Sequence, residues 1–185
     1  MKAAVLTEYR KVEWKEVDVP SISGNEVLIK VGYACICGSD QHVFLGEFHP
    51  RTSVPLIQGH EFAGTIVKTG PAVRNFKTGD RVAVDPIIWC GHCSACKRHH
   101  YPACSTLKLV GIDLDGRFGE FMKEPETMLY KVTEKISDRH AALVEVLSIG
   151  FHACNRARVS KDDRIVIWGA GKVGQSILQA VRTKP

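Results

Sequence analysis

The sequence lacks any segment that would place it in a membrane. No apolar stretch approaches the ~20 residues needed to cross a bilayer. The N-terminal stretch MKAAVLTEYRKVEW meets charge too early to form the apolar core of a secretory signal. We therefore predict a cytoplasmic protein with no membrane partner.

Long runs of positive charge are also missing. The net charge is only +5, and the 25 Lys and Arg residues are scattered along the chain. Aromatic residues make up 8% of the sequence, which leaves few side chains to stack on bases. This pattern is typical of a solvated surface, and we expect no nucleic-acid partner.

Internal repeats and low-complexity linkers are absent, and the first part of the chain has the pattern of short strands. Segments rich in Val, Ile and Ala alternate there with turn residues such as Pro, Gly, Asn and Asp. Many short strands of this kind predict a mainly β fold, an antiparallel barrel or sandwich. The expected strands cover residues 3–6, 26–31, 62–68 and 81–84.

The pattern changes near Ser137, which is a good helix N-cap. Helical spacing then follows at Ala142, Val146, Ile149 and Ala153. Further on, residues 163–168 predict a buried strand, a glycine-rich turn comes next, and a helix is expected over residues 173–181. One strand and one helix cannot bury both faces of a parallel sheet, so we expect a truncated chain.

Seven cysteines without an export signal point to metal binding or catalysis rather than to disulfides. Four of them have the spacing C-x2-C-x2-C-x7-C and satisfy tetrahedral zinc completely, which predicts a structural site. An iron–sulfur cluster, a zinc ribbon that binds nucleic acid and ordinary buried cysteines are the alternatives. The four residues are Cys90, Cys93, Cys96 and Cys104.

A second group of metal-binding residue types lies in two separate segments, Cys37 to His42 and Gly59 to Glu61. Cysteine, histidine and glutamate are all zinc ligands, and a three-ligand mixed set leaves a position for water or substrate. Spacing alone does not show that the two segments meet.

The order of the motifs resembles that of zinc-dependent medium-chain alcohol and polyol dehydrogenases. CGSDxH, GHE, GDRV, the four-cysteine loop, LVEVLSIGFHA and the glycine-rich turn follow one another over essentially the whole chain. The resemblance implies a GroES-like antiparallel β-barrel catalytic domain over residues 1–150. It also implies the first strand–helix unit of an incomplete Rossmann domain over residues 151–185. Family members are about twice this length, which agrees with the expected truncation.

The resemblance also implies roles for single residues at a catalytic zinc. Cys37 and His60 match the first two ligands, and Glu61 matches a carboxylate that binds the metal or exchanges with water. Glu145 stands where ethanol-type enzymes have cysteine and where sorbitol- or threonine-type enzymes have glutamate. Val146 departs from the proline that is frequent in the family. With the cysteine cluster, two zinc ions per intact chain are expected.

Three further residues are candidates for proton transfer. Ser39 matches the family hydroxyl and is the expected first proton acceptor, and His42 passes the proton toward solvent. Asp40 is a candidate to hold the second imidazole nitrogen of His60 and so fix its tautomer. For Ser39 and Asp40 the alternative is a plain turn role.

The glycine-rich turn predicts a nicotinamide dinucleotide site at the start of a helix. The residue that separates NAD from NADP comes about 20 positions later, beyond Pro185, so both cofactors stay open. The expected cofactor-binding residues are Gly169, Gly171, Lys172, Val173 and Gly174.

The leading functional hypothesis is zinc-dependent oxidation of a secondary alcohol on a polyol, sugar or sugar acid. An L-threonine 3-dehydrogenase-type oxidation is the alternative within the family. Alternatives of other kinds are a non-catalytic zinc domain that binds nucleic acid and a zinc-free reductase relative. We expect an inactive 185-residue fragment, and an intact parent that is a homo-dimer or homo-tetramer.

Overall fold

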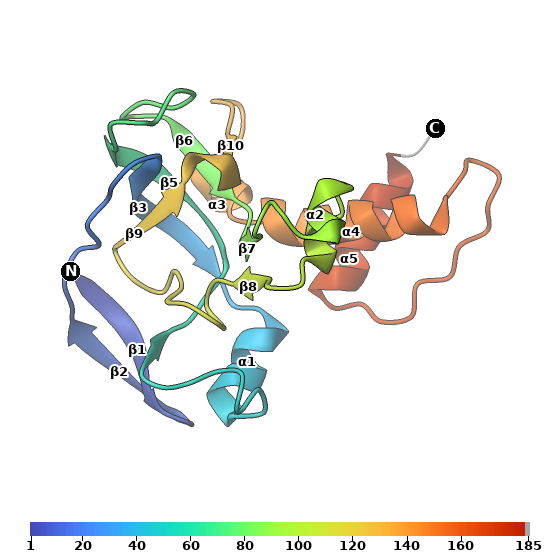
Figure 1. Ribbon diagram of the computed structural model, residues 1–185. Helices are drawn as coiled ribbons and strands as arrows, with labels where there is room; N and C mark the ends of the chain where they lie inside the picture. The colour runs from blue at the N-terminus through green and yellow to red at the C-terminus, as the bar shows by residue number, and fades with distance from the viewer. Residues whose placement is uncertain (184–185) are drawn as a thin grey trace. The chain divides into compact units, whose positions relative to one another are not determined.

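The computed structural model describes residues 1–183. The chain forms two compact units, Met1–Ala142 and Leu143–Pro185, and each is described by itself. In Figure 1 the first unit runs from blue to light orange, and the second from orange to red. Helix α4 runs across the predicted domain boundary after residue 150, and that boundary stays a prediction.

The first unit is built from short strands in three antiparallel sheets (Figure 1). The strand orders are β2-β1-β4, β10-β6-β5-β3-β9 and β7-β8. This architecture confirms the predicted mainly β class, and all four expected strands are present. The strands are β1 (Lys2–Glu8), β2 (Lys11–Glu16), β3 (Glu26–Cys35), β4 (Leu56–Ile57), β5 (Glu61–Thr69), β6 (Arg81–Val84), β7 (Ile87–Ile88), β8 (Lys108–Leu109), β9 (Phe121–Pro125) and β10 (Leu129–Lys131).

Short helices connect these strands. No helix among the described residues is long and apolar enough to cross a membrane. The α-helices of the first unit are α1 (Gly38–Leu45), α2 (Ser94–Lys97) and α3 (Asp138–Ala141), and the 3-10 helices are η1 (Tyr101–Ala103) and η2 (Glu126–Met128).

The main core lies on one face of the five-stranded sheet. Because successive side chains of a strand point to opposite faces, Val27 and Ile29 of β3 and Phe62 and Ile66 of β5 turn inward together. All four are at most 1% exposed. Glu61 therefore lies on the opposite face of β5 from Phe62, away from this apolar core.

The second unit packs α4 (Val144–Ala157) against α5 (Lys172–Arg182). The predicted helix after Ser137 is interrupted: Ser137 caps the short α3, and α4 starts afresh at Val144. The predicted apolar stripe was partly wrong, because Ile149 is 43% exposed. The buried stripe is instead Val146, Gly150 and Cys154. A Cβ at Gly150 would lie 2.5 Å from the Ser176 backbone, so the absence of a side chain lets the helices approach.

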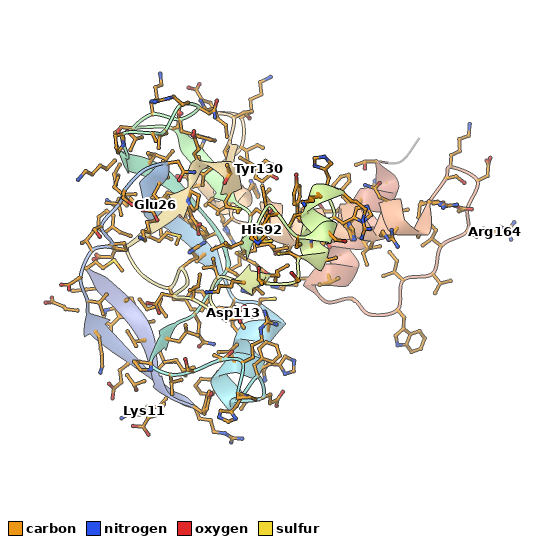
Figure 2. All side chains as sticks on the ribbon, viewed as in Figure 1. Lys11, Glu26, His92, Asp113, Tyr130 and Arg164 are labelled. Carbon is orange, nitrogen blue, oxygen red and sulfur yellow. The ribbon has the colours of Figure 1, made fainter. Side chains whose placement is uncertain are left out.

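The strand predicted over residues 163–168 is not formed: this segment pairs with no other strand within residues 1–183. Figure 2 labels Arg164 in it. The physical reason is the absence of a partner, because a strand exists only through its hydrogen bonds to a neighbour. Its apolar side chains are exposed accordingly, with Val166 88% and Trp168 98% accessible. The helix predicted after the glycine turn is confirmed as α5.

Candidate metal centres

The four cysteines of the C-x2-C-x2-C-x7-C motif come together in one loop of the first unit. Cys90 follows β7, Cys93 is the N-cap of α2, Cys96 lies on α2, and Cys104 is the C-cap of η1. All four sulfur atoms lie within 4.8 Å of one another. The short helices thus bring the cysteines together from positions up to fourteen residues apart.

The sulfur geometry fits a single tetrahedral ion. Four sulfurs about 2.3 Å from one zinc ion are about 3.8 Å apart, and Cys90 Sγ lies 4.0 Å from Cys96 Sγ. A multi-iron cluster spreads its thiolates over several metal atoms and needs a wider cage. The compact arrangement favours the structural zinc hypothesis over the iron–sulfur alternative.

Backbone donors and burial act on the thiols in opposite directions. The N–H groups of Cys96 and Ser105 lower the pKa of Cys93 to about 5. The backbone N–H of Cys90, 3.4 Å from Cys104 Sγ, lowers the pKa of the Cys104 thiol. Burial instead raises the pKa of Cys96 to about 12. Four adjacent thiolates need a cation among them, which the donor set is suited to hold.

His92, labelled in Figure 2, lies in the same loop. Its Nδ1 is 2.9 Å from the Cys90 carbonyl oxygen. The ring therefore contacts the backbone of its own loop, and it is not part of the four-sulfur group.

Antiparallel pairing of β3 with β5 brings Cys37 to His60. Cys35, the last residue of β3, pairs with Glu61, the first residue of β5. In an antiparallel ladder the residues after Cys35 continue opposite the residues before Glu61. Cys37, His60 and Glu61 accordingly place a sulfur, an imidazole nitrogen and a carboxylate oxygen within 4.8 Å of one another. Sequence spacing alone did not show that Cys37 lies close to His60 and Glu61. The register of β3 against β5 places them together.

Buried partners fix this second group. Cys37 is the N-cap of α1, and its backbone N–H donates to Asp40 Oδ2 at 2.7 Å. Asp40 Oδ1 lies 3.6 Å from His60 Nδ1, an ion-pair distance that is too long for a hydrogen bond. Gln58 Nε2 donates to the Asp40 carbonyl oxygen at 2.7 Å. The Asp40 carboxylate thus contacts both Cys37 and His60, the residues from the two separate segments.

The electrostatics of this group follow from these contacts. Burial lowers the pKa of His60, but the Asp40 carboxylate and the Cys37 sulfur together raise it to about 10. His60 lowers the pKa of the Cys37 thiol, against the effect of burial, and the backbone and hydroxyl of Ser39 lower it further. A thiolate, an imidazole and a carboxylate at these positions fit a zinc ion, whose charge displaces the protons.

Ser39 and His42 both lie on α1, three residues apart, so they share one side of the helix. The hydroxyl and the backbone of Ser39 both lower the pKa of the Cys37 thiol, two residues before it. His42 is exposed, and its Nδ1 lies 2.5 Å from Glu47 Oε2. Their roles in proton transfer stay a prediction.

Glu145 lies in the first turn of α4, in the second unit. Its predicted role as a ligand of the same metal stays a prediction. The hydroxyl of Ser148 donates to the Glu145 backbone carbonyl oxygen at 2.6 Å, a hydrogen bond within α4.

The glycine-rich turn has the backbone that the motif predicts. Gly169 has φ +109°, a conformation that side chains other than hydrogen rarely permit. Gly171 is the N-cap of α5, and Lys172 and Val173 open the helix. A Cβ at Gly174 would lie 2.0 Å from the Gly169 carbonyl oxygen. An added Cβ at Gly169 or Gly171 would meet no atom within 4 Å, so the backbone before α5 is open there. A phosphate site at this turn stays a prediction.

Sequence reasoning missed two contact residues near α1. Gln58 holds the backbone of Asp40, and Glu47 contacts His42. Nothing in the sequence indicated the contact of Gln58 with Asp40, apart from its position directly before the GHE motif. The position of Glu47 near His42 could have been predicted, because Glu47 directly follows a glycine that is able to end a helix after His42.

Comparison with known proteins places the chain in a family. Residues 23–134 match the alcohol dehydrogenase GroES-like domain. The chain is 37% identical to the sorbitol dehydrogenase of Bacillus subtilis strain 168, over 98% of its own length and 52% of that protein.

Two solved structures show the same fold. A zinc-binding dehydrogenase of Sinorhizobium meliloti 1021 bound to NADP superposes with a TM-score of 0.93 and 31% identity, covering 98% of this chain and 52% of that one. An alcohol dehydrogenase of Escherichia coli CFT073 complexed with NADH superposes with a TM-score of 0.92 and 33% identity, covering 98% and 53%. The chain spans about half the length of the curated relatives it matches. It belongs to the zinc-dependent medium-chain alcohol and polyol dehydrogenase family, of which it carries the GroES-like domain.

Proposed function

We propose that this chain provides the metal-binding part of a dehydrogenase that oxidises a secondary alcohol of a polyol, sugar or sugar acid with a nicotinamide cofactor. The observation that carries the proposal is the mixed donor set of Cys37, His60 and Glu61 within 4.8 Å. Such a set leaves one position of a tetrahedral ion for water or substrate, which a closed structural site lacks. The four-cysteine loop supplies the second, structural site.

Individual residues of the chain have separate roles in the proposed alcohol oxidation. A zinc ion, when bound, supplies a Lewis acid that makes the hydroxyl of the substrate easier to deprotonate. Ser39, two residues after Cys37 in the first turn of α1, accepts the hydroxyl proton at Oγ as its own Oγ hydrogen passes to His42. His42 receives that proton on the exposed side of α1 and releases it to water. Asp40 orients His60 from its buried position.

The polyol assignment rests on Glu145 and on the sorbitol dehydrogenase relative. We propose Glu145 as the third protein ligand of the catalytic ion beside Cys37 and His60, in the place where ethanol-type enzymes have cysteine. Glu61 then exchanges with water or substrate at the fourth position. A carboxylate there makes the site harder than a thiolate would. The solved neighbours bound to NADP and NADH support a nicotinamide at Gly169 to Gly174, with either cofactor.

Two predictions about the setting of the protein accompany this proposal. A cytoplasmic location suits the seven cysteines, none of which forms a disulfide in the described part of the chain. A homo-dimer or homo-tetramer of the full-length protein is expected, which size-exclusion chromatography with light scattering measures directly.

Metal analysis of the full-length protein tests the two-site assignment. The wild type should hold two zinc ions per chain, and Cys37→Ala should hold one. Cys35→Ala is the matched control: it lies two residues away, donates to the Ala142 carbonyl oxygen and should keep both ions. A single zinc ion that survives Cys37→Ala would contradict a catalytic site at these residues. Two iron atoms in place of zinc would contradict the metal assignment.

Activity with a panel of polyols, sugar acids and L-threonine, each with NAD and NADP, tests the substrate class. Oxidation of a polyol or sugar acid supports the proposal. Turnover of L-threonine alone would replace it with the amino-alcohol reading. Two bound zinc ions without oxidation of any member would favour a non-catalytic zinc domain.

A further inference from the structure

We infer that Glu47 is a positioning residue that holds the imidazole of His42 in the form able to accept a proton. The inference rests on the proposed function, because it concerns the same proton path. Glu47 lies outside the motifs that define the family resemblance. It is assigned by its contact with His42: Glu47 Oε2 lies 2.5 Å from His42 Nδ1.

The path begins at the N-terminus of α1. Cys37 is the N-cap, Ser39 follows in the first turn, and His42 lies three residues after Ser39. Side chains three apart on a helix are neighbours, with about 5–6 Å between their Cβ atoms. Asp40 and Val43 are the buried residues of α1, which leaves Ser39 and His42 together on a flank. A single short helix therefore connects the metal group to an exposed imidazole.

The end of α1 places Glu47 beside that imidazole. Gly46 ends the helix with φ +82°, the left-handed conformation typical of helix C-caps. The chain then turns back, and the Glu47 backbone N–H donates to the His42 carbonyl oxygen at 3.0 Å. This turn fixes the Glu47 backbone one helical turn from His42. The Glu47 side chain therefore loses little conformational entropy when it contacts His42 Nδ1.

Phe48 restricts the same ring from a second direction. The His42 and Phe48 rings are stacked, with centroids 6.1 Å apart and an interplanar angle of 25°. Phe48 itself packs against the cluster of Leu6, Val43, Leu56 and Ile112. The His42 ring is thus held by a carboxylate at one nitrogen and by an aromatic face anchored in the core.

The contact decides which nitrogen accepts a proton. A carboxylate only accepts hydrogen bonds, so Nδ1 carries the hydrogen and donates it to Glu47. In the neutral ring Nε2 is then the bare nitrogen that takes the proton from Ser39. The imidazolium so formed keeps Nδ1–H on the Glu47 carboxylate and loses the Nε2 proton to water. The cycle balances: one proton arrives at Nε2, one leaves from Nε2, and Glu47 stays a carboxylate.

Nitrogen-15 NMR of the 185-residue chain tests the tautomer without any requirement for activity. Spectra are recorded at alkaline pH, where imidazoles are neutral. In the wild type His42 should be protonated on Nδ1. Glu47→Gln keeps an acceptor oxygen and should retain this tautomer, whereas Glu47→Ala should shift His42 toward the Nε2-protonated form. Glu16→Ala, an exposed glutamate on β2, is the control and should leave His42 unchanged. An unchanged His42 tautomer in Glu47→Ala would overturn the inference.

Kinetics of the full-length protein test the consequence for catalysis. Because the pair is exposed and the hydrogen bond is charge-assisted, kcat should fall about fivefold in Glu47→Ala and by less in Glu47→Gln, which keeps the tautomer, with KM for the alcohol unchanged. Glu47→Asp should restore part of the loss. Equal kcat in wild type and Glu47→Ala would overturn the inference while the proposed function stands. A wild type that oxidises no alcohol would refute the proposed function. The tautomer measurement would still show whether Glu47 holds the His42 ring.

Discussion

Arg117 and Glu124 form an ion pair inside the first unit, and replacing one or both tests what that pair contributes to stability. Arg117 is 1% exposed and Glu124 is 2% exposed. The guanidinium carbon lies 4.8 Å from the centre of the Phe62 ring. Burial lowers the pKa of Arg117 well below its usual value, a direct sign of the desolvation cost. Beyond the ion pair, the guanidinium nitrogens of Arg117 have no hydrogen-bond partner within residues 1–183.

The burial sets the expected magnitudes. Arg117→Met leaves a desolvated carboxylate alone and should destabilise the unit by about 3–5 kcal/mol, and Glu124→Leu, which leaves the guanidinium alone, should cost a similar amount. The double replacement Arg117→Met with Glu124→Leu removes both charges together. Because few additional hydrogen bonds offset the desolvation of the pair, the double variant should be neutral or stabilised by about 1–4 kcal/mol. The two single effects are therefore expected to be strongly non-additive.

Urea unfolding of the zinc-saturated chain provides the assay. Trp89 packs against the main core and stacks on Tyr101 with ring centres 4.2 Å apart, so its fluorescence reports the first unit. The other two tryptophans, Trp14 and Trp168, are 68% and 98% exposed and should change little. Arg139→Met replaces an exposed arginine and should shift stability by at most about 0.5 kcal/mol.

Two outcomes would refute this reasoning. One is an Arg117→Met variant within about 1 kcal/mol of the wild type, which would mean that the Glu124 carboxylate finds water or another partner. The other is a double variant as unstable as the sum of the single ones, which would mean that the charges do not compensate each other.

Three further predictions concern other parts of the chain. Gly150→Ala should loosen α4 from α5 and lower amide-exchange protection in both helices. The steric clash of the new Cβ with the Ser176 backbone costs more than the ~1 kcal/mol of helix propensity that alanine gains. Unchanged protection would contradict the close packing. Cys96→Ser should lower the bound zinc by one ion and reduce the thermal midpoint, and a full zinc complement would exclude the four-sulfur site. Arg51 holds the pKa of Asp113 below its usual value, so the pair stabilises the fold above the unfolded carboxyl pKa and loses that contribution as pH falls through the folded one. Asp113→Asn should thus lower the melting temperature at pH 7, and its difference from the wild type should shrink as pH falls below the unfolded carboxyl pKa. A loss that stays constant with pH would contradict it.

The sequence by itself determined the class of the fold and which residue types are available to bind a metal. Period-two strands, turn residues and helix caps are local signals, and they predicted β1, β3, β5, β6 and α5. The cysteine spacing is also local, because a loop with two short helices brings the four sulfurs within 4.8 Å of one another. The ordered motifs predicted the family.

Only the tertiary structure decided how distant residues meet. Cys37 reaches His60 because Cys35 pairs with Glu61, and strand register is a long-range property that spacing does not encode. The same holds for Glu47 at His42, which depends on a turn at Gly46, and for Arg117 at Glu124, which depends on burial. Residues 163–168 show the converse: an apolar, strand-like sequence remains unpaired because a strand needs hydrogen bonds from a neighbour, which no local sequence can supply.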